Sequence, residues 1–163
     1  MTARFLYSTV TMNFKLVPHT PPLNTGNRAE RRVLFVDDEP AIVFAYSRLL
    51  GGERFQHDVC ETIEDATNHL KTKKYFAVVS DVRFSGSGNE DGLFFVSEVK
   101  KVQPDAKVIL VTGYGSKDLE MCARLLGASH YFEKPIRPFL ILSLLRELHH
   151  AALEQDSTSA FRI

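Results

Sequence analysis

The chain has 163 residues, a length that predicts one domain large enough to bury its own core. Lys and Arg together number 20, as do Asp and Glu, so no overall charge draws the chain to nucleic acid or to an anionic membrane. No apolar run approaches the ~20 residues of a membrane span, and residues 1–17 lack the apolar stretch of a signal peptide. We therefore expect neither nucleic acid nor a membrane among its partners.

Residues 1–30 are predicted to be an N-terminal extension and linker. Within them, Val10, Met12, Phe14 and Leu16 alternate with polar residues, a strand pattern that Pro18 ends. Two interpretations fit this pattern. The segment is either a poorly ordered leader upstream of a start at Met12, or a strand that adds to the edge of a sheet.

From residue 31 to residue 153, strand patterns alternate with helix patterns, and we predict one domain over this range. The predicted strands are Val33–Val36, Phe55–Cys60, Tyr75–Asp81, Lys107–Val111 and His130–Phe132. The predicted helices cover residues 40–50, 62–72, 92–102, 116–126 and 138–153. Residues 82–91 are predicted to form a mobile loop, and residues 154–163 a polar C-terminal tail. Such alternation favours a doubly wound α/β fold, in which helices cover both faces of a parallel sheet.

Polar side chains follow four of the five predicted strands. They are the pair Asp37-Asp38, then Asp81, Thr112 and Lys134. Because parallel strands end at the same edge of a sheet, we expect these groups to lie close together. Crowded carboxylates repel one another unless a cation offsets their charge. Carboxylate oxygens are ligands that Mg²⁺ prefers, so the pattern indicates a magnesium site.

The ordered set of these segments resembles the signature of response-regulator receiver domains. The matching segments are Val33–Glu39, Val78–Asp81, Val111–Gly113 and Phe132–Pro135. The resemblance covers about residues 32–153. It implies a flavodoxin-like fold, with five parallel strands in the order 2-1-3-4-5.

The resemblance also implies a chemistry. Asp81 would accept a phosphoryl group from a sensor histidine kinase or a histidine phosphotransfer protein in a two-component system. Asp81, Asp38, Asp37 and the main-chain carbonyl of Arg83 would hold the Mg²⁺ ion that this transfer needs. Such a protein is a signalling phosphoacceptor and not an enzyme, since it catalyses only its own phosphorylation and dephosphorylation.

Two further groups complete the implied site. Lys134 would contribute a positive charge, with a cis bond to Pro135, and Thr112 would donate its hydroxyl to the bound phosphoryl group. In the family a strand-five aromatic then turns inward, and Tyr131 matches that position. The signal would leave through the fourth helix, fifth strand and fifth helix toward a downstream protein target.

The predicted helix over residues 138–153 has a wide apolar arc. Ile141, Leu145, Leu148 and Ala152 form the predicted core stripe, and Leu140, Leu144 and Ala151 widen it. This apolar arc is wider than a helix needs when only one of its faces is buried, so we hypothesise a homodimer through this helix. Nine residues after Glu154 leave no room for an output domain, so we expect a stand-alone receiver or a piece of a longer protein.

Two alternatives are open at this stage. The first is a receiver-fold module that binds proteins without being phosphorylated. The second, a phosphatase of the haloacid dehalogenase type, is disfavoured because its nucleophile would lie in an Asp-x-Asp motif on the first strand, whereas Glu39 stands at the third position here. Cys60 and Cys122 lie on separate predicted elements without metal-ligand spacing, so we expect reduced thiols and a cytoplasmic location.

Overall fold

The computed structural model describes residues 32–53, 55–81 and 91–159. Several predictions lie outside these residues. They are the extension or added strand in residues 1–30, the loop over residues 82–90 with the Arg83 carbonyl, and the last four residues of the tail.

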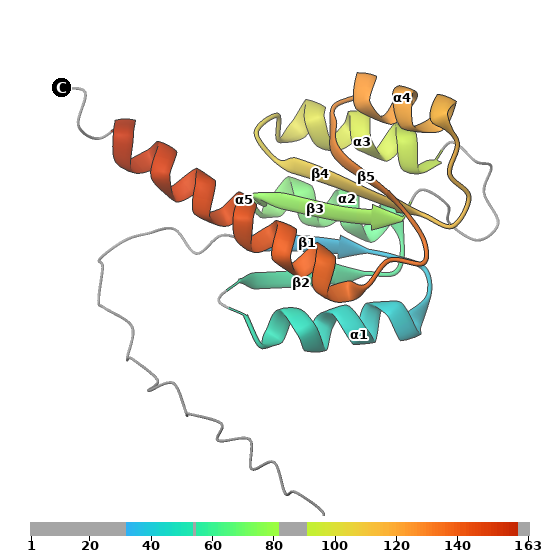
Figure 1. The fold of residues 1–163 in the computed structure, drawn as a ribbon, viewed down its shortest axis with the longest axis horizontal. Coiled ribbons are helices and arrows are strands. Elements are labelled where there is room, and N and C mark those ends of the chain that lie inside the picture. The colour runs from blue at the N-terminus through green and yellow to red at the C-terminus, as the bar shows by residue number, and fades with distance from the viewer. Residues whose placement is uncertain (1–31, 54, 82–90, 160–163) are drawn as a thin grey trace, which may run out of the picture.

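Five strands and five helices alternate along the described chain (Figure 1). The strands are β1 (Arg32–Val36), β2 (Gln56–Cys60), β3 (Ala77–Asp81), β4 (Lys107–Thr112) and β5 (Ala128–Glu133). The helices are α1 (Pro40–Gly51), α2 (Ile63–Thr72), α3 (Asp91–Val102), α4 (Lys117–Leu125) and α5 (Pro138–Ser159). The sheet has the order β2-β1-β3-β4-β5, and every neighbouring pair is parallel. The predicted fold is confirmed.

The core consists of two layers, one on each face of the sheet. Figure 1 shows α1 and α5 on one face and α2, α3 and α4 on the other. Strand β3 lies in the middle and all five of its residues are buried. Its Val78 packs in the layer under α2, α3 and α4, and Val79 packs in the layer under α1 and α5. A strand that is covered on both sides has no polar face, which explains its unbroken apolar run.

Local signals in the sequence set most helix starts. The Thr62 and Ser116 hydroxyl oxygens each accept a hydrogen bond from the backbone N–H three residues later, at 3.1 Å. Pro40 opens α1, where its missing N–H leaves no helix hydrogen bond unmade. Strand β5 begins two residues before the predicted His130. Gly127, with a φ of 105°, turns the chain directly from α4 into that strand.

Helix α5 differs from its predicted bounds and face. It runs to Ser159 rather than to residue 153, and Figure 1 shows its C-terminal part extending past the sheet. Ile141 and Leu145 are buried as predicted, but Leu142 is also buried, at 4% exposure, and was not in the predicted stripe. Leu140 is 50% exposed, so part of the apolar arc faces outward. Within the described ranges, no helix is both long and apolar enough to cross a membrane.

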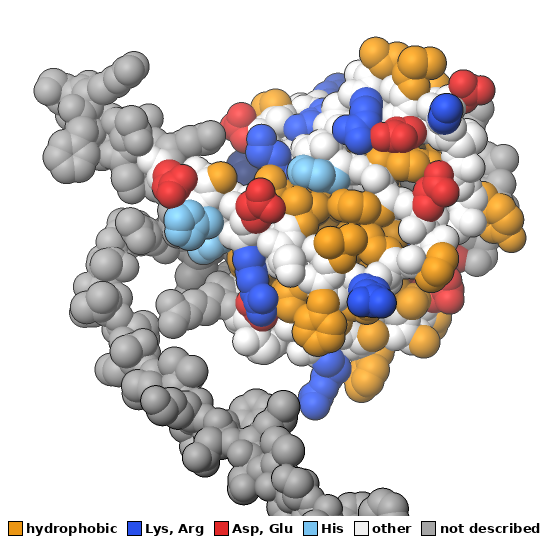
Figure 2. All heavy atoms as spheres, in the orientation of Figure 1, with side chains coloured by type: hydrophobic (Ala, Val, Ile, Leu, Met, Phe, Trp, Pro, Cys, Tyr) orange, Lys and Arg blue, Asp and Glu red, His pale blue; other side chains and the backbone are white. Residues whose placement is uncertain are grey.

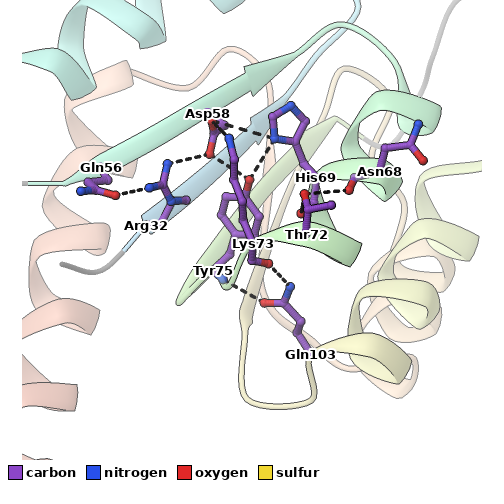
Figure 3. A network of polar contacts seen from close by, with 9 residues as sticks. All are labelled: Arg32, Gln56, Asp58, Asn68, His69, Thr72, Lys73, Tyr75 and Gln103. Atoms are coloured by element: carbon purple, nitrogen blue, oxygen red, sulfur yellow. Dashed lines mark hydrogen bonds and ion pairs between the residues drawn. The ribbon is translucent and has the colours of Figure 1, made fainter. Parts of the chain in front are cut away.

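A polar network joins β1, β2 and the turn before β3 (Figure 3). The Asp58 carboxylate on β2 accepts hydrogen bonds from Arg32 at 3.0 Å, Lys73 at 2.6 Å and the Tyr75 hydroxyl at 2.9 Å. His69 Nδ1 lies 3.2 Å from the same hydroxyl. Burial alone would raise the pKa of Asp58, but these donors lower it to about 2. The charged carboxylate therefore ties β1, β2 and the start of β3 together.

Gln103, just after α3, extends this network. Its amide nitrogen donates to the carbonyl oxygens of Leu70 at 2.9 Å and Lys73 at 2.7 Å, and its amide oxygen accepts from the Tyr75 N–H at 2.8 Å. The side chain is 4% exposed. It satisfies three backbone groups that would otherwise be buried without partners, and so fixes the end of α3 against the turn between α2 and β3.

Candidate functional site

The strand ends bring three of the predicted site residues together. Asp37 follows β1, Asp81 ends β3 and Lys134 follows β5, and the strand arrows in Figure 1 all point to this edge. The Lys134 ammonium donates to Asp81 Oδ2 at 2.6 Å and to Asp37 Oδ2 at 3.2 Å. The two carboxylates are nearly buried, with residue exposures of 7% and 2%. One lysine therefore bridges two carboxylates that come from strands far apart in the sequence.

Backbone contacts hold the lysine in place. The Lys134 N–H donates to the carbonyl oxygen of Thr112, the last residue of the neighbouring β4, at 2.7 Å. The peptide bond from Lys134 to Pro135 is cis, as the resemblance implied. Asp37 Oδ1 accepts from the backbone N–H of Glu39 at 3.0 Å, at the start of α1. The site is thus attached to β4 and α1 as well as to its own strands.

Burial and the neighbouring charges of opposite sign shift the pKa values of Asp37 and Lys134 in opposite directions. Burial raises the pKa of Asp37, and the charge of Asp81 adds to the effect, while the Glu39 N–H and Lys134 lower it; the net direction is upward. Burial would lower the pKa of Lys134, but its hydrogen bond to Asp81 and the charges of Asp37 and Asp81 raise it well above its ordinary value. Lys134 is therefore fully charged at neutral pH.

The other predicted residues surround the bridge. Thr112 is fully buried, and its hydroxyl oxygen accepts from the Tyr114 N–H at 3.2 Å. Asp38 is half-buried beside Asp37. Tyr131 is partly buried and packs against the core layer under α2, α3 and α4, and burial raises its pKa. Its ring already lies partly inward in this structure.

Among the described residues, no three Asp, Glu, His or Cys side chains lie close enough to hold a metal ion. In this structure the Lys134 ammonium lies between the Asp37 and Asp81 carboxylates. Two buried carboxylates that already face one cation still fit Mg²⁺, which binds through one or two carboxylates and keeps several waters.

Two features beside the site were not predicted. Glu39 Oε1 lies 3.7 Å from the Lys134 ammonium, although Glu39 was not among the predicted site residues. A cavity of about 300 Å³ adjoins Asp37, Asp81 and Lys134 on the α1 side. Tyr46 lines it and stacks on Phe35 with ring centroids 4.0 Å apart; burial raises the pKa of Tyr46 to about 12. In the sequence, Tyr46 is one of several apolar residues at helical spacing. Nothing in that pattern distinguishes a tyrosine that lines a cavity from one that packs in the core.

A comparison with protein families matches residues 33–146 to the response regulator receiver domain. The chain belongs to this family. The photosynthetic apparatus regulatory protein RegA of Rhodobacter capsulatus is 29% identical to this receiver domain over 107 residues, which cover 66% of the chain and 56% of RegA. The chain thus matches little more than half the length of that relative.

Solved structures agree with this assignment. A CheY-like receiver domain protein from Methanospirillum hungatei is 25% identical, with a TM-score of 0.69, and the match covers 76% of this chain and 98% of that one. The beryllofluoride-activated NtrC4 receiver domain dimer is 33% identical, with a TM-score of 0.62, covering 76% of this chain and 97% of that one. The receiver domain described here is accordingly a signalling domain of two-component systems.

Proposed function

We propose that Asp81 accepts a phosphoryl group from a sensor histidine kinase or a histidine phosphotransfer protein, in a reaction that depends on Mg²⁺. The observation that carries this proposal is the Lys134 ammonium, held between Asp81 at 2.6 Å and Asp37 at 3.2 Å. A fixed positive charge beside a buried carboxylate is what a phosphoryl acceptor needs. Such a charge, already in place beside the acceptor, helps to neutralise the oxygens of the transferred group.

In this reaction an Asp81 carboxylate oxygen forms a bond to phosphorus while the P–N bond of the donor phosphohistidine breaks. The electron pair of that bond leaves on the imidazole nitrogen. Asp37, Asp38, Asp81 and the Arg83 carbonyl would hold Mg²⁺, whose chemistry here is to offset the negative charge of the phosphoryl oxygens. Lys134 supplies the second positive charge, and it must loosen its bond to Asp81 as the phosphoryl group arrives.

Phosphorylation of Asp81 would be signalled through movements of the Thr112 and Tyr131 side chains. The Thr112 hydroxyl, buried at the end of β4, turns to donate to the phosphoryl group and gives up its contact with the Tyr114 N–H. Tyr131 on the adjacent β5 then moves further into the space beside α4. The changed surface of α4, β5 and α5 contacts a downstream protein target. The unit that does this is the domain over residues 31–153, acting in the cytoplasm.

We also propose that the domain forms a homodimer through α5. Leu140 is 50% exposed and Leu144 is only partly buried, so apolar surface remains on this helix after the core is packed. Hydrophobic side chains gather on the face of the molecule that α5 crosses (Figure 2). The NtrC4 receiver domain at 33% identity is described as a dimer. A second copy would cover this surface and remove it from water.

Phosphorylation in vitro tests the main proposal. Wild type incubated with acetyl phosphate and Mg²⁺ should gain the mass of one phosphoryl group, and Asp81→Asn should not. Asp118→Asn, which removes an exposed carboxylate on α4, is the matched control and should react like wild type. A wild-type protein that never gains mass would instead support the alternative, a receiver-fold module that binds proteins without phosphorylation. Release of free phosphate with many turnovers would indicate a phosphatase.

A further inference from the structure

The end of the sheet opposite the acid site carries a group of exposed lysines. Lys71 lies in the last turn of α2 and Lys101 in the last turn of α3. Lys74 lies in the turn before β3, and Lys107 is the first residue of β4. All four side chains are exposed, and we call this group the basic edge. The chain as a whole is neutral, so the fold concentrates positive charge that composition does not reveal.

Contacts between the elements place these lysines side by side. Gln103, two residues after Lys101, bonds to the backbone on both sides of Lys74, and Figure 3 shows its side chain reaching to that turn. The Lys107 N–H donates to the Phe76 carbonyl oxygen at 2.8 Å, which sets β4 beside the same turn. Gln103 also donates to the carbonyl oxygen of Leu70, next to Lys71, so all four lysines lie around the segments that Gln103 and β4 hold together.

No ion pair neutralises these lysines within the described part of the chain. None of the four side-chain ammonium groups makes a hydrogen bond or ion pair with a described residue, whereas the neighbouring Lys73 bonds to Asp58. Asp105 is the acidic residue in the same turn as Lys107. Burial lowers the pKa of the adjacent Lys100, and the charge of Lys107 lowers it further. Like charges held this close favour an anionic partner.

Apolar side chains border the basic edge. Val102 at the end of α3 and Leu126 after α4 are each 39% exposed. The two helix ends are in contact, because a Cβ atom added at Gly127 would lie 2.9 Å from Lys100 Cγ. The surface thus offers both cationic groups and apolar area within a short distance.

We propose that the basic edge, together with Val102 and Leu126, binds a segment of a partner protein in which Asp or Glu residues alternate with apolar residues. Such a segment matches both parts of the surface, whereas a nucleic-acid backbone offers no apolar group to Val102 or Leu126. The four charges are also lysines, which act as point charges and lack the forked geometry with which arginine recognises phosphate. Because the surface lies at the other end of the sheet from Asp81, it stays accessible while the acid site is occupied.

Fluorescence anisotropy with a defined probe tests this proposal. The probe is a labelled peptide in which Glu alternates with Leu, and the same peptide with Gln for Glu is its control. Lys101→Gln/Lys107→Gln should bind the Glu peptide about two- to thirtyfold more weakly than wild type, as expected for two exposed ion pairs. Arg48→Gln/Lys117→Gln removes two exposed charges elsewhere and should bind like wild type. Raising the salt from 0.01 M to 0.1 M, which shortens the screening length from ~30 to ~10 Å, should weaken wild-type binding.

Several results would overturn the proposal. They are equal binding of the Glu and Gln peptides, equal weakening by both double variants, or no binding at low salt. Tighter binding of a short DNA duplex, or of phosphatidylglycerol vesicles, that Lys101→Gln/Lys107→Gln abolishes would show that the edge binds phosphate instead. Both double variants should still gain a phosphoryl group from acetyl phosphate, so this test is independent of the proposed role of Asp81.

Discussion

Replacing Lys134 with Met tests how the acid site is held together. The variant keeps the length and volume of the side chain but leaves Asp37 and Asp81 buried and facing each other without the cation between them. Removing one partner of a buried ion pair costs ~3–5 kcal/mol. Because the Lys134 side chain is 24% exposed and water reaches the site, we expect a loss of about 2 kcal/mol in the free energy of unfolding. For a chain of this size that corresponds to a fall of roughly 6 °C in Tm.

Acid and magnesium should each reverse much of this loss. In Lys134→Met the pKa of Asp37, already raised by burial, loses the opposing effect of the lysine and rises further. A carboxyl group with a raised pKa in the folded state destabilises the fold fully at pH values above that pKa, so this part of the deficit should shrink as the pH falls through the raised pKa and vanish below the unfolded value. Mg²⁺ should stabilise the variant more than wild type, because no ammonium competes for the two carboxylates.

Thermal unfolding of the variants at several pH values, with and without Mg²⁺, measures these effects. Lys117→Met removes an exposed lysine on α4 and should change Tm little under any condition. If Lys134→Met unfolds at the wild-type temperature, and Mg²⁺ shifts both proteins equally, then the lysine does not hold the two carboxylates and the account of the site is wrong.

Three further predictions concern the rest of the molecule. Asp58→Asn should lower the free energy of unfolding by about 2 kcal/mol at pH 7, since the pKa of Asp58 falls from 3.8 to about 2 on folding. In urea titrations this difference should vanish as the pH falls from 3.8 through 2, and a constant difference would contradict it. Gln103→Ala should cost about 2 kcal/mol and speed hydrogen exchange at the Tyr75 N–H; unchanged exchange would refute the bond. Sedimentation should show a dimer in the presence of a phosphoryl mimic. A monomer at high concentration with and without it would rule out dimerisation through α5.

The sequence was sufficient for the fold and for the edge where the site lies. Strand β3 is a run of buried residues, apolar up to Ser80, that ends on Asp81, and such a run is typical of a strand covered on both faces. The alternation of strands and helices indicates a parallel sheet. In a parallel sheet all strands end at the same edge, so Asp37, Asp81 and Lys134 must lie at that edge. The order of the strands came from the family resemblance and not from periodicity.

Contacts between distant residues could not be predicted. The Asp58 network joins groups from β1, β2, α2 and the start of β3, and no local pattern pairs them. Leu142 is buried in the same core layer as α1 residues, and Arg146 of α5 donates to Glu53, just after α1, at 2.9 Å. The basic edge was missed for the same reason, since its lysines are spread over α2, α3, β4 and a turn of a neutral chain.

The position of the phosphoryl group tests the central claim most directly. Wild type treated with acetyl phosphate and Mg²⁺ can be reduced with borohydride, which converts an aspartyl phosphate to homoserine, and then digested and sequenced by tandem mass spectrometry. We predict homoserine at position 81 alone. Homoserine at position 37 or 38, or at no position in a protein that is folded and has bound Mg²⁺, would contradict the account.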